Sequence, residues 1–217
     1  MNPRGTGAAR QPSTARLSAS AGTERSNQKE RTRTAIVAAA RAAMTGGGEV
    51  TMPDVAKRAL VSEATAYRYF PDLSSLLHAA LAASLDNPEH AMAPVGHSED
   101  PVERIGFATE ILLREVLAYQ PAVRAMVAAA VTRPAAVQRP ERRFGLIDEA
   151  LRPLENTMAV QQPARFAQLK RGLAVVVSAD TLFTLTDQCG LTAELAIASA
   201  IETARSLTAA AIRPAPR

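Results

Sequence analysis

The sequence has one cysteine, Cys189, and no tryptophan, and aromatic residues make up only 4% of its 217 residues. A single cysteine excludes an intrachain disulfide and cannot build a metal cluster alone. The lack of disulfides is typical of proteins in a reducing cytoplasm. No apolar run reaches the roughly 18 residues of a membrane span, and the N-terminus lacks the apolar core of a secretory signal. We therefore expect a cytoplasmic protein that makes no membrane contact.

Small and aliphatic residues take the place of aromatics. Apolar residues form 47% of the chain, which is enough for a sizeable core. Alanine, leucine, valine and isoleucine must fill that core, and alanine is the strongest helix former. The composition predicts an all-α protein.

The charge is distributed unevenly along the chain. Residues 1–80 hold 11 Lys/Arg and 6 Asp/Glu, whereas residues 81–217 hold 14 and 15. A DNA-binding module needs such a positive excess, and a solvated basic tail would produce the same sum.

Residues 1–27 are rich in Ser, Ala, Gly, Thr and Arg and show no apolar periodicity, so we predict a disordered basic arm. An arginine-rich arm can follow phosphates or enter a minor groove. A solubilising tail or a misassigned start codon explains the same residues. The cations that lead to the first helix are Arg4, Arg10, Arg16, Arg25, Lys29, Arg31 and Arg33.

Apolar spacing predicts a three-helix domain over residues 28–80. We expect the first helix at residues 27–44. The second helix should begin after Thr51 as its N-cap, and the third should span residues 63–70 with Ser62 as its N-cap. Pro71 ends the third helix, and Asp72 caps a fourth that runs to about Asp86. A short helix after a three-residue turn has the spacing of a helix-turn-helix, whose second helix fits the major groove of DNA.

The first residues of such a recognition helix face the base edges. They are Glu63, Ala64, Thr65 and Arg68. Arg68 is expected to contact guanine as a bidentate donor, and Thr65 a thymine methyl group or a phosphate. Glu63 either accepts from a cytosine amine or only favours the positive end of the helix.

Other polar residues of this domain are expected to position it on the phosphate backbone without reading sequence. Tyr67 and Tyr69 offer hydroxyl groups, and Arg31 and Arg33 offer cations at the head of the first helix. Tyr67 has an alternative role in the core, because it shares a helix face with Phe70.

Residues 81–217 are expected to form an antiparallel helical bundle, which brings the whole chain to about nine helices. A loop at 87–100 precedes five helices, which we expect at 101–119, 121–132, 140–156, 163–188 and 191–212. The last helix repeats small residues, which suit close packing across a two-fold axis or against another helix of the same chain. These residues are Ala196, Ala200, Ala204, Thr208 and Ala211.

The sequence offers no nucleophile or acid–base constellation, so we predict neither an enzyme nor a cofactor. His90 and His97 lie in the predicted loop with a spacing that matches no metal-ligand pattern, and His78 is expected at the surface or in packing. Cys189 has no resolving cysteine in the chain. We therefore predict neither catalytic nor metal-binding residues.

The segment 31–81 resembles the TetR family of transcriptional regulators. The resemblance lies in residues 36–40 (IVAAA), 51–56 (TMPDVA), Val61-Ser62 and 65–70 (TAYRYF), and in the spacing to Leu76-Leu77. It covers about a quarter of the chain. Residues 185–191 (LTDQCGL) are similar to the junction before the last helix in this family.

The resemblance implies a homodimer with an N-terminal DNA-reading domain. It also implies a larger C-terminal domain that binds a small-molecule effector and dimerises through its last two helices. By the same analogy, the Thr51 hydroxyl contacts a phosphate. Two recognition helices would then read a near-palindromic operator in double-stranded DNA.

Three positions depart from the family pattern. Leu60 replaces the usual glycine of the turn, and a non-glycine residue at positive φ is costly, so a different turn is expected. Ala64 replaces a common glycine, and Leu73 replaces a lysine that usually anchors a phosphate.

An effector pocket is expected among the helices of residues 101–188. Each candidate has ordinary core packing as its alternative, and Asp180 also has a structural role open to it, at a local break near Ser178. The candidates are Phe107, Ile111, Leu112, Val116, Met126, Val127, Phe144, Ile147, Asp180 and Phe183.

The function expected from the sequence is an effector-responsive DNA-binding transcriptional regulator, most simply a repressor. A helical module that binds protein instead of DNA is a second interpretation, favoured by Leu60 and Leu73. An all-helical ligand carrier or enzyme is a third.

Overall fold

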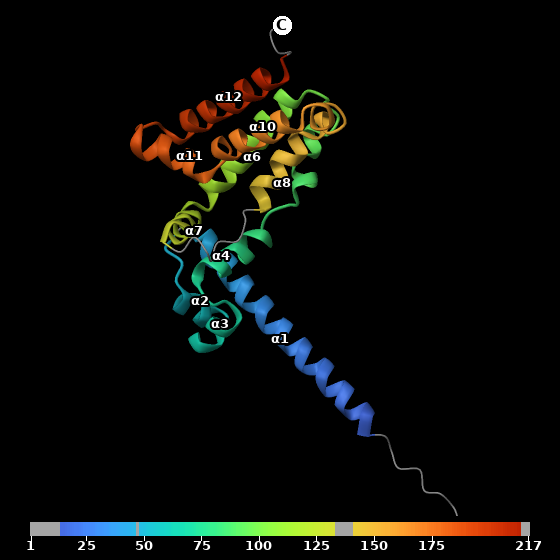
Figure 1. Cartoon of the computed structure of the whole chain (residues 1–217). Coiled ribbons are helices and arrows are strands. Elements are labelled where there is room, and N and C mark those ends of the chain that lie inside the picture. The colour runs from blue at the N-terminus through green and yellow to red at the C-terminus, as the bar shows by residue number, and fades with distance from the viewer. Residues whose placement is uncertain (1–13, 47, 133–140, 214–217) are drawn as a thin grey trace, which may run out of the picture.

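The computed structural model describes residues 14–46, 48–132 and 141–213, and every regular element in these ranges is helical, as the composition predicts. Figure 1 shows two groups of helices joined end to end, with the N-terminal α1 projecting far beyond both. The first group, α1–α4, is called the head below. The second group, α5–α12, is called the C-terminal domain.

The head consists of α1 (Thr14–Thr45), α2 (Met52–Arg58), α3 (Glu63–Tyr69) and α4 (Leu73–Ala82). The predicted caps are confirmed, because Thr51, Ser62 and Asp72 each accept a hydrogen bond from the backbone N–H three residues ahead. Helices of seven residues are unstable alone, so packing must hold α2 and α3. Their core consists mainly of Ile36, Val37, Ala40, Met44, Val50, Met52, Val55, Ala56, Ala66, Phe70, Leu76, Leu77 and Ala80.

The predicted disordered arm is wrong for residues 14–27, which form the first turns of α1. Residues 1–13 lie outside the described part of the chain. Between Thr14 and Asn27 the only helix-breaking residue is Gly22, while Ala, Arg and Leu favour the helix. Lack of an apolar stripe therefore did not imply lack of helix, because α1 continues outward from a packed C-terminal half.

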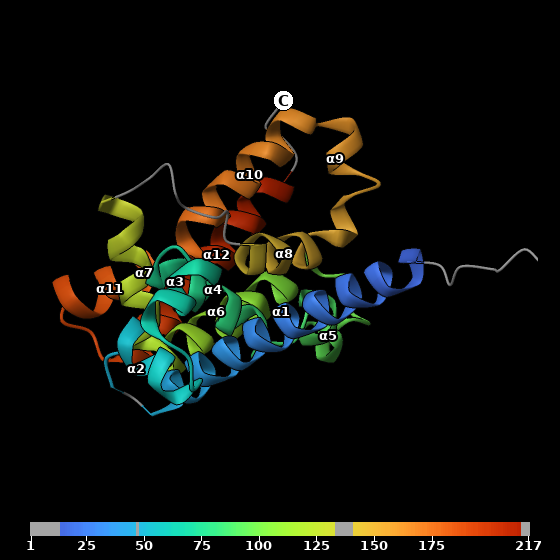
Figure 2. The same cartoon turned by 90° about the horizontal axis from the view of Figure 1, so that it is seen from below.

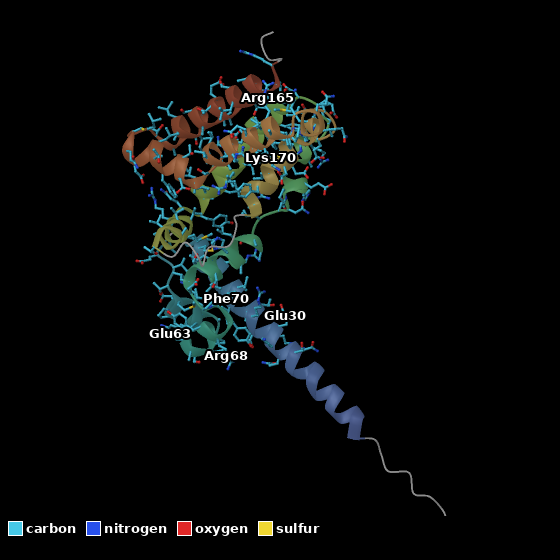
Figure 3. The ribbon with its side chains drawn as sticks, viewed as in Figure 1. Glu30, Glu63, Arg68, Phe70, Arg165 and Lys170 are labelled. Carbon is cyan, nitrogen blue, oxygen red and sulfur yellow. The ribbon has the colours of Figure 1, made fainter. Side chains whose placement is uncertain are left out.

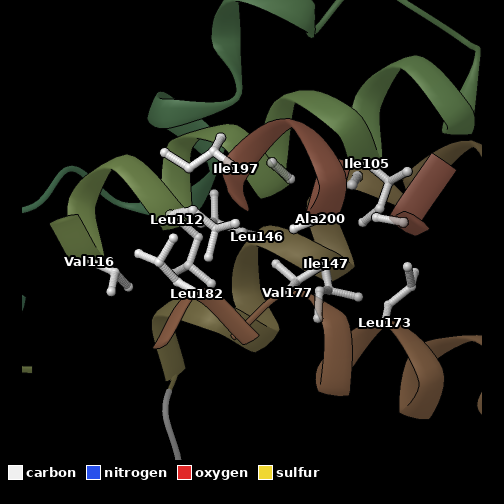
Figure 4. Packing of buried hydrophobic residues seen from close by; sticks show 14 of the residues in the cluster. Ile105, Leu112, Val116, Leu146, Ile147, Leu173, Val177, Leu182, Ile197 and Ala200 are labelled. Carbon is white, nitrogen blue, oxygen red and sulfur yellow. The ribbon is translucent and has the colours of Figure 1, made fainter. Parts of the chain in front are cut away.

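The C-terminal domain holds α5 (Pro88–Ala91), α6 (Pro101–Ala118), α7 (Gln120–Thr132), α8 (Glu141–Ala150), α9 (Met158–Gln161), α10 (Pro163–Val176), α11 (Ala179–Phe183) and α12 (Ala193–Ile212). Helix α12 packs chiefly along α6, and α8 and α10 close the core beside them. Figure 4 shows the interdigitated side chains, including Ile105, Leu146, Leu173 and Ile197.

Several predicted boundaries need correction. Helix α5 and a 3-10 turn at Ala93–Val95 occupy part of the predicted loop. The predicted helix at 163–188 is broken, since Ser178 caps a new helix, and a π-helical turn follows at Thr184–Gln188. The apolar stripe continues through this break, so periodicity alone did not reveal where the serine side chain takes over the backbone N–H of Thr181.

The row of small residues on α12 faces its own subunit. Ala196, Ala200, Ala204 and Thr208 are fully buried, and α6 is the helix that α12 contacts most. The interpretation of this row as a seam between two subunits is therefore wrong. Helix α12 is also long and apolar enough to cross a membrane by length and composition, but a core helix that buries one face passes the same test.

Helix α7 joins the two cores. Ala122 is buried in the head core, and Met126 of α7 packs against the same core, as does Tyr119 at the end of α6. Val123 and Val127 on the same helix pack against the core of the C-terminal domain. A change in the C-terminal domain that moves α7 therefore also moves the α7 side chains that pack against the head.

Candidate nucleic-acid interface and effector crevice

The recognition helix α3 presents a mostly polar outer face. Glu63, Ala64, Tyr67 and Arg68 are exposed, whereas Ala66 is fully buried beneath them. In Figure 3, Glu63 and Arg68 lie on the side of the head that faces away from the C-terminal domain. This face is free to enter a groove of DNA.

Two predicted contact residues already use their hydroxyl groups inside the protein. The Thr65 hydroxyl lies 2.8 Å from the Ser62 hydroxyl, and Thr65 is half-buried. The Thr51 hydroxyl donates to Asp54 Oδ2 at 2.6 Å. Thr51 therefore caps α2, whereas Thr65 lies inside α3 beside the cap Ser62, and either hydroxyl group can still meet a phosphate from its position.

Arg68 makes no hydrogen bond or ion pair with another described residue, and its guanidinium lies 5.6 Å from the centroid of the Tyr69 ring. It is available for an outside partner. Tyr67 is 45% exposed, so the alternative of a core role is not supported. Tyr69 is half-buried and packs against the head core.

The turn between α2 and α3 keeps a left-handed residue without a glycine. Leu60 has a φ of 56°, and its side chain is 92% exposed. The expectation of a differently shaped turn is therefore wrong, because Val61 donates to the Ala56 carbonyl at 3.0 Å and closes the turn around the strained residue. Of the other departures, Ala64 is exposed and Leu73 packs against the head core.

Arg31 and Arg33 are both exposed on α1 but on different sides of it, because residues two apart on a helix point about 200° apart. Arg33 lies over the Phe70 ring, 5.4 Å from its centroid, and Phe70 is the C-cap of α3. Arg33 thus faces the recognition helix, and Arg31 does not.

The comparison with protein families agrees with this geometry. Residues 36–80 match the family described as bacterial regulatory proteins, tetR family. The head is a TetR-family DNA-binding domain. The match lies within the head, and it indicates a DNA-binding role for this part of the chain.

No curated protein matches the chain. Among solved structures, RolR in complex with its ligand resorcinol aligns with a TM-score of 0.49 and 19% identity. The alignment covers 88% of this chain and 98% of the RolR chain.

A crevice of about 440 Å³ lies between α7 and α11 of the C-terminal domain. It is lined by Arg124, Val127, Ala128, Asp180, Phe183, Thr184, Asp187 and Gln188. Three of the predicted pocket residues line it, namely Val127, Asp180 and Phe183. Asp180 is exposed rather than buried, and the cap at the helix break is Ser178.

The other predicted pocket residues are packed elsewhere. Leu112, Val116 and Ile147 are buried core, and Phe107 and Ile111 pack against that core. Met126 packs against the head core instead, and Phe144 lies under the guanidinium of Arg143, 5.1 Å from it. Within the described residues, these side chains fill space rather than line the crevice.

Sequence reasoning found Asp180 but missed Arg124 and Asp187, the other charged residues of the crevice. Arg124 donates from Nη1 and Nη2 to the two carboxylate oxygens of Asp187, at 2.7 and 2.8 Å. Hydrogen bonds from Arg124 and then Thr186 lower the pKa of Asp187, and the same pairing raises the pKa of Arg124. Burial lowers the pKa of nearby Arg143, and Asp180 opposes that shift.

Among the described residues, no group of three His, Cys, Asp or Glu side chains is placed to hold a metal ion. His78 bonds through Nδ1 with the Ser74 carbonyl at 2.8 Å, while His90 and His97 are exposed. Cys189 is exposed beside Gly190.

Proposed function

We propose that the protein is an effector-responsive repressor that binds a near-palindromic operator as a homodimer in the cytoplasm. The observation that carries this proposal is the exposed face of α3. Arg68 lies on it without an ion pair to any described residue, and Ser62 fixes the start of the helix. A bidentate Arg–guanine contact contributes roughly 1–3 kcal/mol of discrimination between bases. Arg33, Thr51, Tyr67 and Tyr69 contact phosphates in this proposal.

The remaining recognition residues have smaller roles. Thr65 meets a thymine methyl or a phosphate, and Ala64 lets the helix approach the groove closely. Glu63 lies in the first turn of α3, where it favours the helix dipole. Arg31 stays a candidate phosphate contact only if the duplex bends around α1.

In this proposal the dimer forms through α10 and α12, since the family resemblance implies dimerisation through the last two helices. The contact does not use the row of small residues on α12, which is buried within the chain. The apolar side chains that these helices leave exposed are Val175, Leu195, Leu207 and Ile212. The two recognition helices must then stand about 34–36 Å apart to enter adjacent major grooves.

The crevice supports a regulatory role because it lies against α7, which packs into both cores. Its apolar side is formed by Val127, Ala128 and Phe183, and its polar side includes Arg124 and Asp187. A small organic effector that binds there shifts α7, and with α7 the separation of the two heads. The ligand thereby favours one arrangement of a two-state dimer.

The experiment is a selection of bound duplexes from a random pool, followed by titration of wild type and Arg68→Ala with the selected and a scrambled duplex. We expect wild type to prefer the selected duplex, and Arg68→Ala to lose about 1–3 kcal/mol of that preference. Arg152→Ala, which removes an exposed arginine outside α10 and α12, is the matched control and keeps the preference. If Arg68→Ala discriminates as well as wild type does, the proposed reading face is wrong.

A further inference from the structure

Helix α1 is far longer than the head needs. It runs from Thr14 to Thr45, and its first buried residue among those with described side chains is Ile36. At 1.5 Å per residue, about 33 Å of helix lies between Thr14 and Ile36. Figures 1 and 2 show this part passing α3 and continuing past the end of the head, away from the C-terminal domain.

The face of α1 that packs on the head is apolar there and becomes basic where the helix extends beyond the head. Residues 25, 29, 33 and 37 are spaced four apart and so form one row along the helix. Val37 is buried in the head, but the preceding members of the row are Arg33, Lys29 and Arg25. These three cations are called the inner row, and no acidic residue shares it.

The contact of Arg33 fixes the direction of the inner row. Its guanidinium lies over Phe70, at the C-terminal end of the recognition helix. Lys29 is exposed one turn farther out, and Arg25 follows at the same spacing. Arg33 therefore faces the side of the head from which α3 would enter a duplex, and the four-residue spacing extends the inner row outward from it.

We propose that the free part of α1 is a second DNA-binding element, which lies along the phosphates that flank the site of α3. This inference rests on the proposed function, since it assumes a duplex against α3. A helix of about 33 Å spans about 10 bp of DNA, at one phosphate per 3.4 Å of strand. This element makes the affinity depend on the length of the duplex and on the salt concentration, and it reads no bases.

Two other occupants fit the free part of α1 less well. Between residues 14 and 35 the only large apolar side chain is Leu17, so a second α1 would find no apolar seam for a coiled coil. The same lack makes an apolar protein groove a poor partner. A polar helix without neighbours is marginal in water, and neutralisation of its cations by phosphates stabilises it.

The test compares two duplexes and two double variants of the full chain. The short duplex, of about 20 bp, covers the sites of two heads, and the long one adds about 10 bp at each end. Arg25→Gln/Lys29→Gln removes two cations of the inner row, whereas Arg152→Gln/Lys170→Gln removes two cations of the C-terminal domain. Glutamine has nearly the helix propensity of both residues, and circular dichroism with thermal melting checks that both variants keep the fold.

We expect wild type and Arg152→Gln/Lys170→Gln to bind the long duplex at least about tenfold more tightly than the short one at low salt. The slope of log affinity against log salt should be steeper on the long duplex by about 0.9 for each added phosphate contact. Arg25→Gln/Lys29→Gln should lose both differences. Equal effects of the two variants, or a wild type that is indifferent to duplex length, would overturn the proposal.

The outcome separates this proposal from the proposed function. A protein that prefers the selected duplex over a scrambled one but ignores duplex length has the proposed reading face and no second element. A protein that gains affinity with length on both sequences has the second element and lacks the reading face. A partner other than DNA on α1 would leave both duplexes equally bound, and this result also overturns the inference.

Discussion

Arg124 on α7 and Asp187 in the π-helical turn form a two-pronged ion pair, and the same guanidinium lies 4.0 Å from the centroid of the Phe183 ring. The pair joins the helix that both cores share to the segment that ends the broken helix. Both side chains remain partly in water, 40% and 46% exposed, so the pair opens at little cost in free energy. A contact that forms and breaks easily at this place suits a regulatory role.

The first prediction concerns the pH dependence of this pair. Because Arg124 lowers the pKa of Asp187, the pair stabilises the fold at a pH above the ordinary aspartate pKa, and this stabilisation is lost as pH falls through the lowered value. Arg124→Gln should therefore be less stable than wild type at neutral pH and equal to it in acid. Carbon NMR of the Asp187 carboxyl should show its pKa returning upward in the variant. A difference in stability that persists unchanged in acid would contradict this assignment.

The second prediction concerns the strained turn of the head. Leu60 holds a left-handed conformation that costs roughly 1 kcal/mol for a residue with a Cβ, and its exposed side chain buries little apolar area in return. Leu60→Gly should raise the free energy of unfolding by about 0.5–1 kcal/mol, measured by urea denaturation. Leu60→Ala keeps the Cβ and serves as the control, which should not gain this stability.

The third prediction concerns a buried arginine that sequence patterns did not reveal. Arg104 is 2% exposed and donates to the carbonyls of Val95 and Glu149 at 2.8 and 2.7 Å. Arg104→Met should destabilise the fold by about 2–4 kcal/mol, because the buried carbonyls lose their donors. Arg152→Met removes an exposed cation that pairs with Glu149, and should cost under about 1 kcal/mol. If urea denaturation gave the same loss of unfolding free energy for Arg104→Met and Arg152→Met, the hydrogen bonds of Arg104 to Val95 and Glu149 would not stabilise the fold as proposed.

The sequence predicted the head well because its signals are local. The caps at Thr51, Ser62 and Asp72 act on backbone groups three residues away, so spacing alone identifies them. The crevice could not be predicted in the same way. Arg124 and Asp187 lie far apart in the chain, and each resembles an ordinary solvated charge until the fold brings them together.

Two errors share a physical cause, since periodicity shows which residues lie on one face but not what covers that face. The inner row of α1 continues the buried face of the helix beyond the head, where the apolar stripe that predicts helices is absent. The small residues of α12 indicated close helix packing, and that packing is with α6 of the same chain. The partner of a face depends on contacts between distant residues.

The last prediction tests that assignment of the α12 row. Ala200 is 1% exposed, so Ala200→Leu must push α6 and α12 apart and should lower the free energy of unfolding by about 1–3 kcal/mol. Ser199→Leu places the same side chain on the exposed face of α12 and is the matched control for the monomer fold. Because the row is internal, the loss in Ala200→Leu should be the same at every protein concentration, as measured by urea denaturation across a hundredfold range. If the row instead joined two subunits, Ala200→Leu would leave the unfolding of the monomer unchanged, and sedimentation would show dissociation that more protein reverses.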